Sequence, residues 1–166
     1  MSKEFHGKYR GIVTDIRDPL MQGRIKAKVP EVYGNNESGW ALPCLAFGGS
    51  QMGFFVLPDI DSAVWIEFEH SDPGYPIWVG SLFASSADMP AQLMSPPYTK
   101  TMIMSKTGHS ITLDDSPGVG GILLQTAGGQ KISMTSSGIE IDNGYGAIIV
   151  LSGNQISFNN GALEVI

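Results

Sequence analysis

The chain has 166 residues, a formal net charge of −6, 21 glycines, 10 prolines and only 16% charged residues. This length allows one domain or two small ones with a buried core, and the composition favours turns and strands over long helices. The negative charge argues against a general nucleic-acid binder. The single cysteine, Cys44, excludes an internal disulfide and a cysteine-based metal site, and its apolar neighbours predict a buried side chain.

The sequence contains no targeting or membrane-spanning signal. Its first residues lack the apolar core of a signal peptide, and no later segment approaches the roughly 18 consecutive apolar residues of a membrane span. We therefore expect a protein that is made and first folded in the cytoplasm.

Residues 1–85 predict a small all-β domain. β-Branched and aromatic residues gather in short runs separated by turn formers such as Asp18-Pro19 and Pro73-Gly74, which makes about five or six strands. A Greek-key barrel of the OB-fold type fits this number and length of strands. The expected strands cover residues 9–16, 24–29, 40–45, 53–57, 62–69 and 76–82.

Residues 86–98 are rich in alanine, serine and proline and keep no sustained periodicity. Such composition is typical of a boundary between domains. We therefore predict a linker over 86–98 and a second domain over 99–166.

The second domain is predicted from a repeat. A glycine followed by two short runs of alternating apolar and polar residues occurs three times, and Ile111, Ile132 and Ile156 are spaced by 21 and 24 residues. Spacing of this kind is typical of stacked repeats. Alternation at every second position gives each strand one apolar and one polar face.

Three short repeats cannot bury their own apolar face, so we expect further copies of the chain to cover it. If several copies wind around one axis, the apolar faces point inward and strand edges pair between chains. The alternative is a single-chain sandwich built with the N-terminal half. The predicted core of the assembly comprises Ile111, Leu113, Ile122, Leu124, Ile132, Met134, Ile139, Ile141, Ile156, Phe158, Leu163 and Val165.

No residues predict a catalytic, cofactor or metal site. His6, His70 and His109 do not have metal-ligand spacing, and a ring of His109 with Asp114 and Asp115 around an ion is a weaker interpretation than a strand end and turn. The carboxylate pairs Asp59/Asp61 and Glu67/Glu69 could serve a glycosidase, but a solvated loop or strand face explains them better. The basic residues near the N-terminus keep open a single-strand nucleic-acid-binding OB-fold.

The order of these segments resembles the central spike proteins of contractile injection machines, which include phage baseplate assembly protein V and the valine-glycine repeat (VgrG) proteins of type VI secretion. The segments that carry the resemblance are Tyr9-Arg10-Gly11-Ile12-Val13, residues 23–30, Trp40-Ala41, residues 53–58, residues 64–69, residues 74–80 and residues 105–115.

The resemblance implies an all-β protein with an N-terminal OB-fold barrel followed by a C-terminal intertwined trimeric β-helix or β-prism. It implies a structural homotrimer that pierces a target membrane as a needle, within a virion tail or an extracellular injection particle of sheath, inner tube and baseplate proteins. No hub domain precedes the barrel, so we expect a separate trimeric hub protein, contacted by Arg10, Arg24, Lys26 and Lys28.

The end of the needle is expected to need a cover. Three copies that end in an apolar strand would leave an exposed edge, which is an aggregation hazard. The resemblance implies a small separate tip protein with Pro-Ala-Ala-Arg repeats, contacted by Leu163, Val165 and Ile166. The alternative functions are a single-strand nucleic-acid binder and a cell-wall-degrading tail enzyme.

Overall fold

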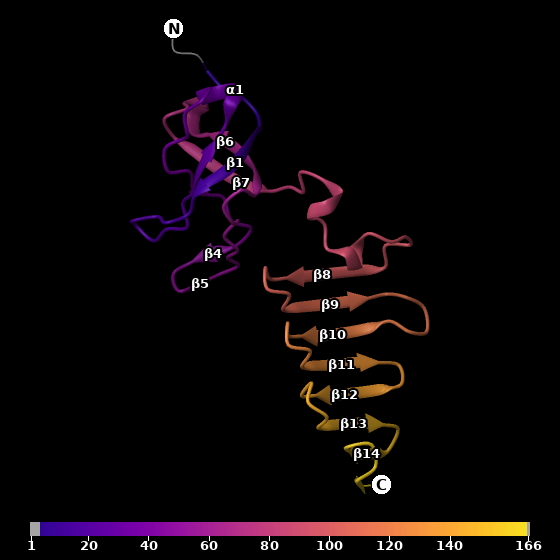
Figure 1. The fold of residues 1–166 in the computed structure, drawn as a ribbon. Helices are drawn as coiled ribbons and strands as arrows, with labels where there is room; N and C mark the ends of the chain where they lie inside the picture. Colours follow the sequence, from indigo (N-terminus) through magenta and orange to yellow (C-terminus); the bar gives the residue numbers. More distant parts are fainter. Residues whose placement is uncertain (1–3, 166) are drawn as a thin grey trace. The chain divides into compact units, whose positions relative to one another are not determined.

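The computed structural model describes residues 4–165, which form two compact units, one ending at Asp88 and the other beginning at Met89. Figure 1 shows that both units consist mainly of strands. The one α-helix of the described chain, α1 (Pro30–Tyr33), has a single turn, and no helix there is long and apolar enough to cross a membrane.

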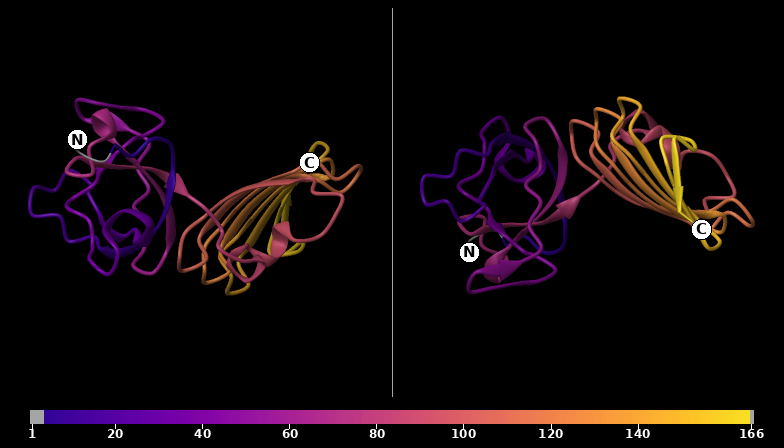
Figure 2. Two further views of the ribbon diagram at one scale, coloured as in Figure 1. Left: turned by 90° about the horizontal axis from the view of Figure 1, so that it is seen from above. Right: turned by 90° about the horizontal axis from the view of Figure 1, so that it is seen from below.

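The N-terminal unit is a curled sheet with the strand order β2-β1-β6-β7-β3. Its two outer strands are joined by a bridge between Ile25 and Ala41, whose backbone N–H groups donate to each other's carbonyl oxygens at 3.2 and 2.7 Å. The sheet thereby closes into a ring, as the views in Figure 2 show. Its strands are β1 (Tyr9–Asp15), β2 (Lys26–Lys28), β3 (Leu42–Pro43), β6 (Ala63–Phe68) and β7 (Pro76–Ser81).

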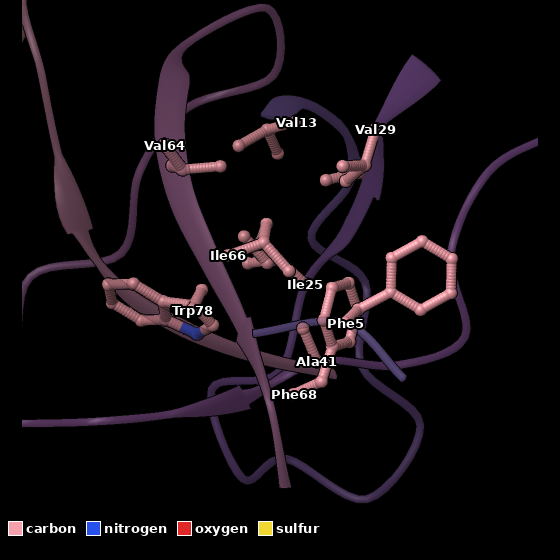
Figure 3. Close-up of a cluster of buried hydrophobic side chains, with 10 residues drawn as sticks. Phe5, Val13, Ile25, Val29, Ala41, Val64, Ile66, Phe68 and Trp78 are labelled. Carbon is pink, nitrogen blue, oxygen red and sulfur yellow. The ribbon is translucent and has the colours of Figure 1, made fainter. Parts of the chain in front are cut away.

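The barrel has a compact apolar core (Figure 3). Alternation along β1 and β6 points every second side chain inward, where Val13, Val64 and Ile66 have no exposed surface. Trp78 closes one side of this core, and its indole Nε1–H donates to the carbonyl oxygen of Gly23 at 3.1 Å. Burial of such side chains contributes about 1.5–3 kcal/mol each.

Residues 44–57 differ from the prediction. The expected strand over 53–57 does not form. A short hairpin of two strands with two residues each, β4 (Gly48–Gly49) and β5 (Met52–Gly53), ends at the first residue of this range, and irregular backbone follows. Cys44, predicted to be buried, is exposed, because β3 pairs with β7 over only two residues and the chain then leaves the sheet.

The C-terminal unit is one antiparallel sheet of eight strands, in which each strand pairs with the next one along the chain (Figure 1). Short turns rich in glycine and asparagine connect the strands, as the sequence suggests. The strands are β8 (Lys100–Met104), β9 (Ser110–Asp114), β10 (Gly121–Gln125), β11 (Lys131–Thr135), β12 (Gly138–Asp142), β13 (Ile148–Ser152), β14 (Gln155–Phe158) and β15 (Leu163–Val165).

Short helical turns occupy the segment between the barrel and this sheet. They are the 3₁₀ turns η2 (Ser86–Asp88) and η3 (Ala91–Leu93), and Leu93 lines a pocket together with Thr99 and Lys100. Part of the segment predicted as a linker therefore packs on the C-terminal unit.

Candidate functional site

One face of the C-terminal sheet carries two continuous rows of apolar side chains. The strand register places these side chains directly opposite one another from strand to strand, so that each row crosses the whole sheet. The first row is Ile103, Ile111, Leu124, Ile132, Ile141, Ile149, Phe158 and Leu163. The second row begins at Thr101 and continues with Leu113, Ile122, Met134, Ile139, Leu151, Ile156 and Val165.

These two rows, the apolar face, are not sheltered within the chain. Twelve of their fifteen apolar side chains keep between 37% of their surface, at Ile139, and 60%, at Leu163, exposed, and Met134, Ile149 and Phe158 are half-buried. The centre of the barrel core, in contrast, has no exposed surface. Soluble monomers rarely expose so large a contiguous apolar surface, and such surfaces mark sites of association. The alternative of a single-chain sandwich built with the N-terminal half does not hold, because the strands of that half form a separate curled sheet around a core of their own.

The opposite face of the sheet is polar over most of its width. Its middle row contains the polar residues Thr112, Ser133, Glu140 and Ser157, together with Met102, Leu123 and Val150. Lys131 lies at the rim of this face and pairs with Glu140 at 2.8 Å, and the hydrogen bond from its ammonium group raises the pKa of Lys131. The two faces thus differ in chemistry, and only the apolar one suits burial.

All twelve residues predicted as the core of an assembly lie in the two apolar rows. Sequence reasoning missed Ile103, Ile149 and Leu151, which lie in the same rows. The last two belong to the run Ile148-Ile149-Val150-Leu151, where every position is apolar and alternation gives no signal. Ile166, one of the three predicted tip contacts, lies outside the described residues.

The register also corrects the repeat. Ile111 and Ile132 share the first row, but Ile156 lies in the second row, opposite Leu151. The reason is the additional strand β13, which the threefold repeat did not include. The spacing of 21 and then 24 residues therefore does not mark three equivalent positions.

Backbone pairing in the sheet is internal to the chain. Each strand from β9 to β14 has a neighbour from the same chain on both sides. The expectation that strand edges pair between copies therefore does not hold for these strands. Association is left to the apolar face and to the outer edges of β8 and β15.

Two of the four predicted hub contacts are engaged within the barrel. Arg24 pairs with Asp18 at 2.6 Å and Lys26 pairs with Glu37 at 2.7 Å, and both cations lie against the ring of Trp40. These pairs hold the loop between β1 and β2 in place.

Arg10 and Lys28 remain on the outer surface of the barrel. They line one groove together with Ile12 and Phe83, and the guanidinium of Arg10 lies 5.7 Å from the centre of the Trp65 ring. Glu31 lines the same groove, so its cations exceed its acids by one, and this net positive charge beside apolar side chains suits an acidic protein surface.

The carboxylate of Asp18 predicts a pH dependence of barrel stability. The Arg24 guanidinium, together with three backbone N–H groups, holds the pKa of Asp18 well below its ordinary value. A depressed pKa contributes stability above about pH 4, and this contribution is lost as the pH falls towards the folded-state pKa. We expect the urea midpoint, measured by tryptophan fluorescence, to fall between pH 7 and pH 3, and to fall less in Asp18→Asn. Equal falls would contradict this assignment.

The structure assembles no catalytic or metal-binding group from the candidates. Among residues 4–165, no three His, Cys, Asp or Glu side chains lie close enough together to hold a metal ion. His109 accepts the backbone N–H of Ala127 at its Nδ1, 3.2 Å away, and Asp114 accepts from the Ser116 hydroxyl at 2.6 Å. Both groups therefore stabilise turns at the ends of strands. Of the carboxylate pairs, Glu67 is bonded to Lys8 on the barrel surface.

Comparison with known proteins agrees with this geometry. Residues 9–83 match the type VI secretion system/phage-baseplate injector OB domain. Residues 100–164, which contain the whole apolar face except Val165, match the phage baseplate V C-terminal trimerisation domain. The chain belongs to the baseplate V family of spike proteins. Its barrel corresponds to the injector OB domain, and its C-terminal sheet corresponds to the trimerisation domain. The second match supports a homotrimer.

A relative of this baseplate V protein is the actin cross-linking toxin VgrG1 of Vibrio cholerae serotype O1, which is 33% identical over 89 residues. The match covers 51% of the present chain but only 8% of the toxin. Both matched families are structural baseplate domains. The chain thus spans only a small part of the length of this relative.

Proposed function

We propose that this protein is the central spike of a contractile tail or injection machine and that its C-terminal sheet forms the membrane-piercing needle. The observation that carries the proposal is the apolar face, which one chain leaves exposed and which lies in a trimerisation domain. Three copies would turn these faces towards a common axis and present the polar faces to the surroundings. The spike is a structural part, and catalysis of a reaction forms no part of its role.

The sheet suits an axial load. Its eight strands are joined by an unbroken series of antiparallel ladders, so that many backbone hydrogen bonds share any force along the series. Each bond contributes only about 1 kcal/mol. Because they are arranged side by side along each strand, they must fail together. A needle built in this way resists buckling when sheath contraction drives it into an envelope.

The other parts of the machine meet the spike at two places. We infer that the groove with Arg10 and Lys28 docks on a separate trimeric hub protein beneath the sheath and inner tube, through attraction to acidic residues. The outer edge of β15 is unpaired in the described chain, and Leu163 and Val165 are more than half exposed there. This edge would receive a small tip protein of the Pro-Ala-Ala-Arg type, which would remove an aggregation hazard.

We therefore expect the protein to act in a particle rather than on nucleic acid. Of the cations that suggested single-strand binding, Arg24 and Lys26 are paired with Asp18 and Glu37 and lie against Trp40, and Arg17 is paired with Asp15. Assembly would take place in the bacterial cytoplasm, and the finished spike would leave as part of a virion tail or an injection particle.

The test is incorporation into particles purified from the producing bacteria. We expect gold-labelled antibody to mark one end of each tail. Reversing the groove charges with Arg10→Glu and Lys28→Glu should lower the amount of spike per particle on the order of tenfold, because the attraction to the hub becomes repulsion. Lys106→Glu is the control, since Lys106 is exposed in the turn between β8 and β9, outside the groove. Particles that contain no spike protein would overturn the proposal.

A further inference from the structure

A second exposed apolar surface lies on the barrel, apart from the trimerisation domain. Residues 39–58 contain no Asp, Glu, Lys or Arg. Within them, Phe47, Met52, Phe54, Phe55 and Val56 each keep more than half of their surface exposed. A solvated loop of twenty residues would normally carry charge, so this segment has the composition of an interface.

The loop between β1 and β2 extends this surface. Leu20 is 60% exposed and Met21 is 91% exposed at its tip. The base of the loop touches the uncharged segment, because a methyl group at Gly23 would come within 2.5 Å of the Phe55 ring. We call the two segments, residues 17–24 and 44–57, the apolar loops.

The apolar loops are held in place rather than loosely attached. The Asp18 carboxylate accepts the backbone N–H groups of Leu20, Gln22 and Arg24 at 2.8–3.2 Å, as well as the Arg24 guanidinium. The Trp78 indole binds the carbonyl of Gly23. A partner that packs on these side chains therefore meets a surface that is already ordered, which lowers the entropic cost of association.

Both apolar loops lie at the end of the barrel where the chain leaves it. β6 is antiparallel to β1 and to β7, so the end of β1, the start of β6 and the end of β7 are at the same side. The loop of residues 17–24 follows β1, and β3, which runs parallel to β7, delivers the chain into residues 44–57 at that side. Figure 1 shows the loop, the β4–β5 hairpin and the departing chain at one end of the barrel.

We propose that the apolar loops of the three copies pack against one another and form a second contact in the trimer, within the collar of OB domains. The chains leave this end of each barrel and continue through residues 82–99 to a shared trimerisation domain. Such a tether holds the three barrels at an effective concentration in the millimolar range. Residues 44–57 carry no charge to repel their own copies, and the charges of the other loop are paired, Arg24 with Asp18 and Arg17 with Asp15. Packing would remove exposed aromatic side chains from water.

Cys44 provides the probe for this contact. It is the only thiol of the chain, it is exposed in the single copy, and it lies in the apolar loops. In the purified full-length trimer, without hub or tip protein, we expect maleimide labelling of Cys44 to be at least about tenfold slower than in the variant Phe54→Asp. Light scattering should show that both proteins remain trimers through the C-terminal domain. Equal labelling rates at equal mass would overturn the proposal.

A monomeric variant shows whether slow labelling of Cys44 comes from contact with other copies or from contacts within one chain. Ile132→Lys is expected to release single chains, in which Cys44 should label rapidly. Protection that persists in the monomer would come from the same chain and would also overturn the proposal. Trp40, Trp65 and Trp78 all lie in the barrel, so their fluorescence shows whether the barrel is folded in each variant. Fast labelling in a wild-type trimer would refute the collar contact alone, whereas a monomeric wild type would refute the spike assembly.

Discussion

Replacing Ile132 by lysine is expected to abolish the trimer. Ile132 lies near the middle of the first apolar row, between Leu124 and Ile141, and three copies would bring three ammonium groups into the shared interior. An uncompensated buried charge costs several kcal/mol per copy, so the assembly should be lost at micromolar concentration. Light scattering should give the 17.8 kDa of one chain or an aggregate, in place of three times that mass.

The neighbouring residue is the matched control. Ser133 lies on the opposite, polar face, directly across from Glu140. Ser133→Lys adds the same charge one residue away, where a carboxylate can accept it, and should leave the mass unchanged. If both variants remain trimeric, the apolar face is not the trimer interface, and if both dissociate, the effect is not specific to that face.

Gly121→Ala should strongly destabilise the C-terminal sheet. A Cβ at Gly121 would lie 2.0 Å from the carbonyl oxygen of Met134, on the adjacent strand β11. Because the obstructing atom belongs to the backbone, β10 and β11 must separate, and we expect a loss of about 3 kcal/mol per chain. Thermal unfolding followed by far-ultraviolet circular dichroism should show an earlier transition for the C-terminal unit.

A glycine with open surroundings provides the comparison. An added methyl group at Gly39 meets no atom within 4 Å. Gly39→Ala should therefore leave both transitions in place, and tryptophan fluorescence should show an intact barrel in both variants. An unchanged transition in Gly121→Ala would mean that β10 and β11 do not pair in the register described.

The faces of the needle could be predicted from the sequence because alternation with a period of two survives in most of its strands. Ile139 and Ile141 flank Glu140, and this pattern alone assigns them to one side. The pattern fails at Ile149 and Leu151, because their neighbours are also apolar. There the side of each residue depends on pairing with β12 and β14, which is a property of the whole sheet.

The barrel shows a different limit of sequence reasoning. Phe54, Phe55 and Val56 have strong strand propensity, yet no neighbouring strand is available to them, and β propensity depends on such a neighbour. The apolar neighbours of Cys44 predicted a buried side chain, but they belong to a segment that leaves the sheet, so the thiol is exposed. Arg24 and Lys26 looked free because their partners Asp18 and Glu37 approach only through the fold of the loops.

The strictly sequential order of β8 to β15 also bears on how these spikes diversify. Because each apolar row passes unchanged from one strand to the next, deletion or duplication of a complete hairpin keeps every remaining side chain on its original side. Each such event would alter the height of the shaft by two strand spacings, or about 9.5 Å. Gain or loss of a single strand would instead reverse the direction in which the last strand of the sheet runs. Trimerisation sheets of related chains should therefore differ in length by whole hairpins.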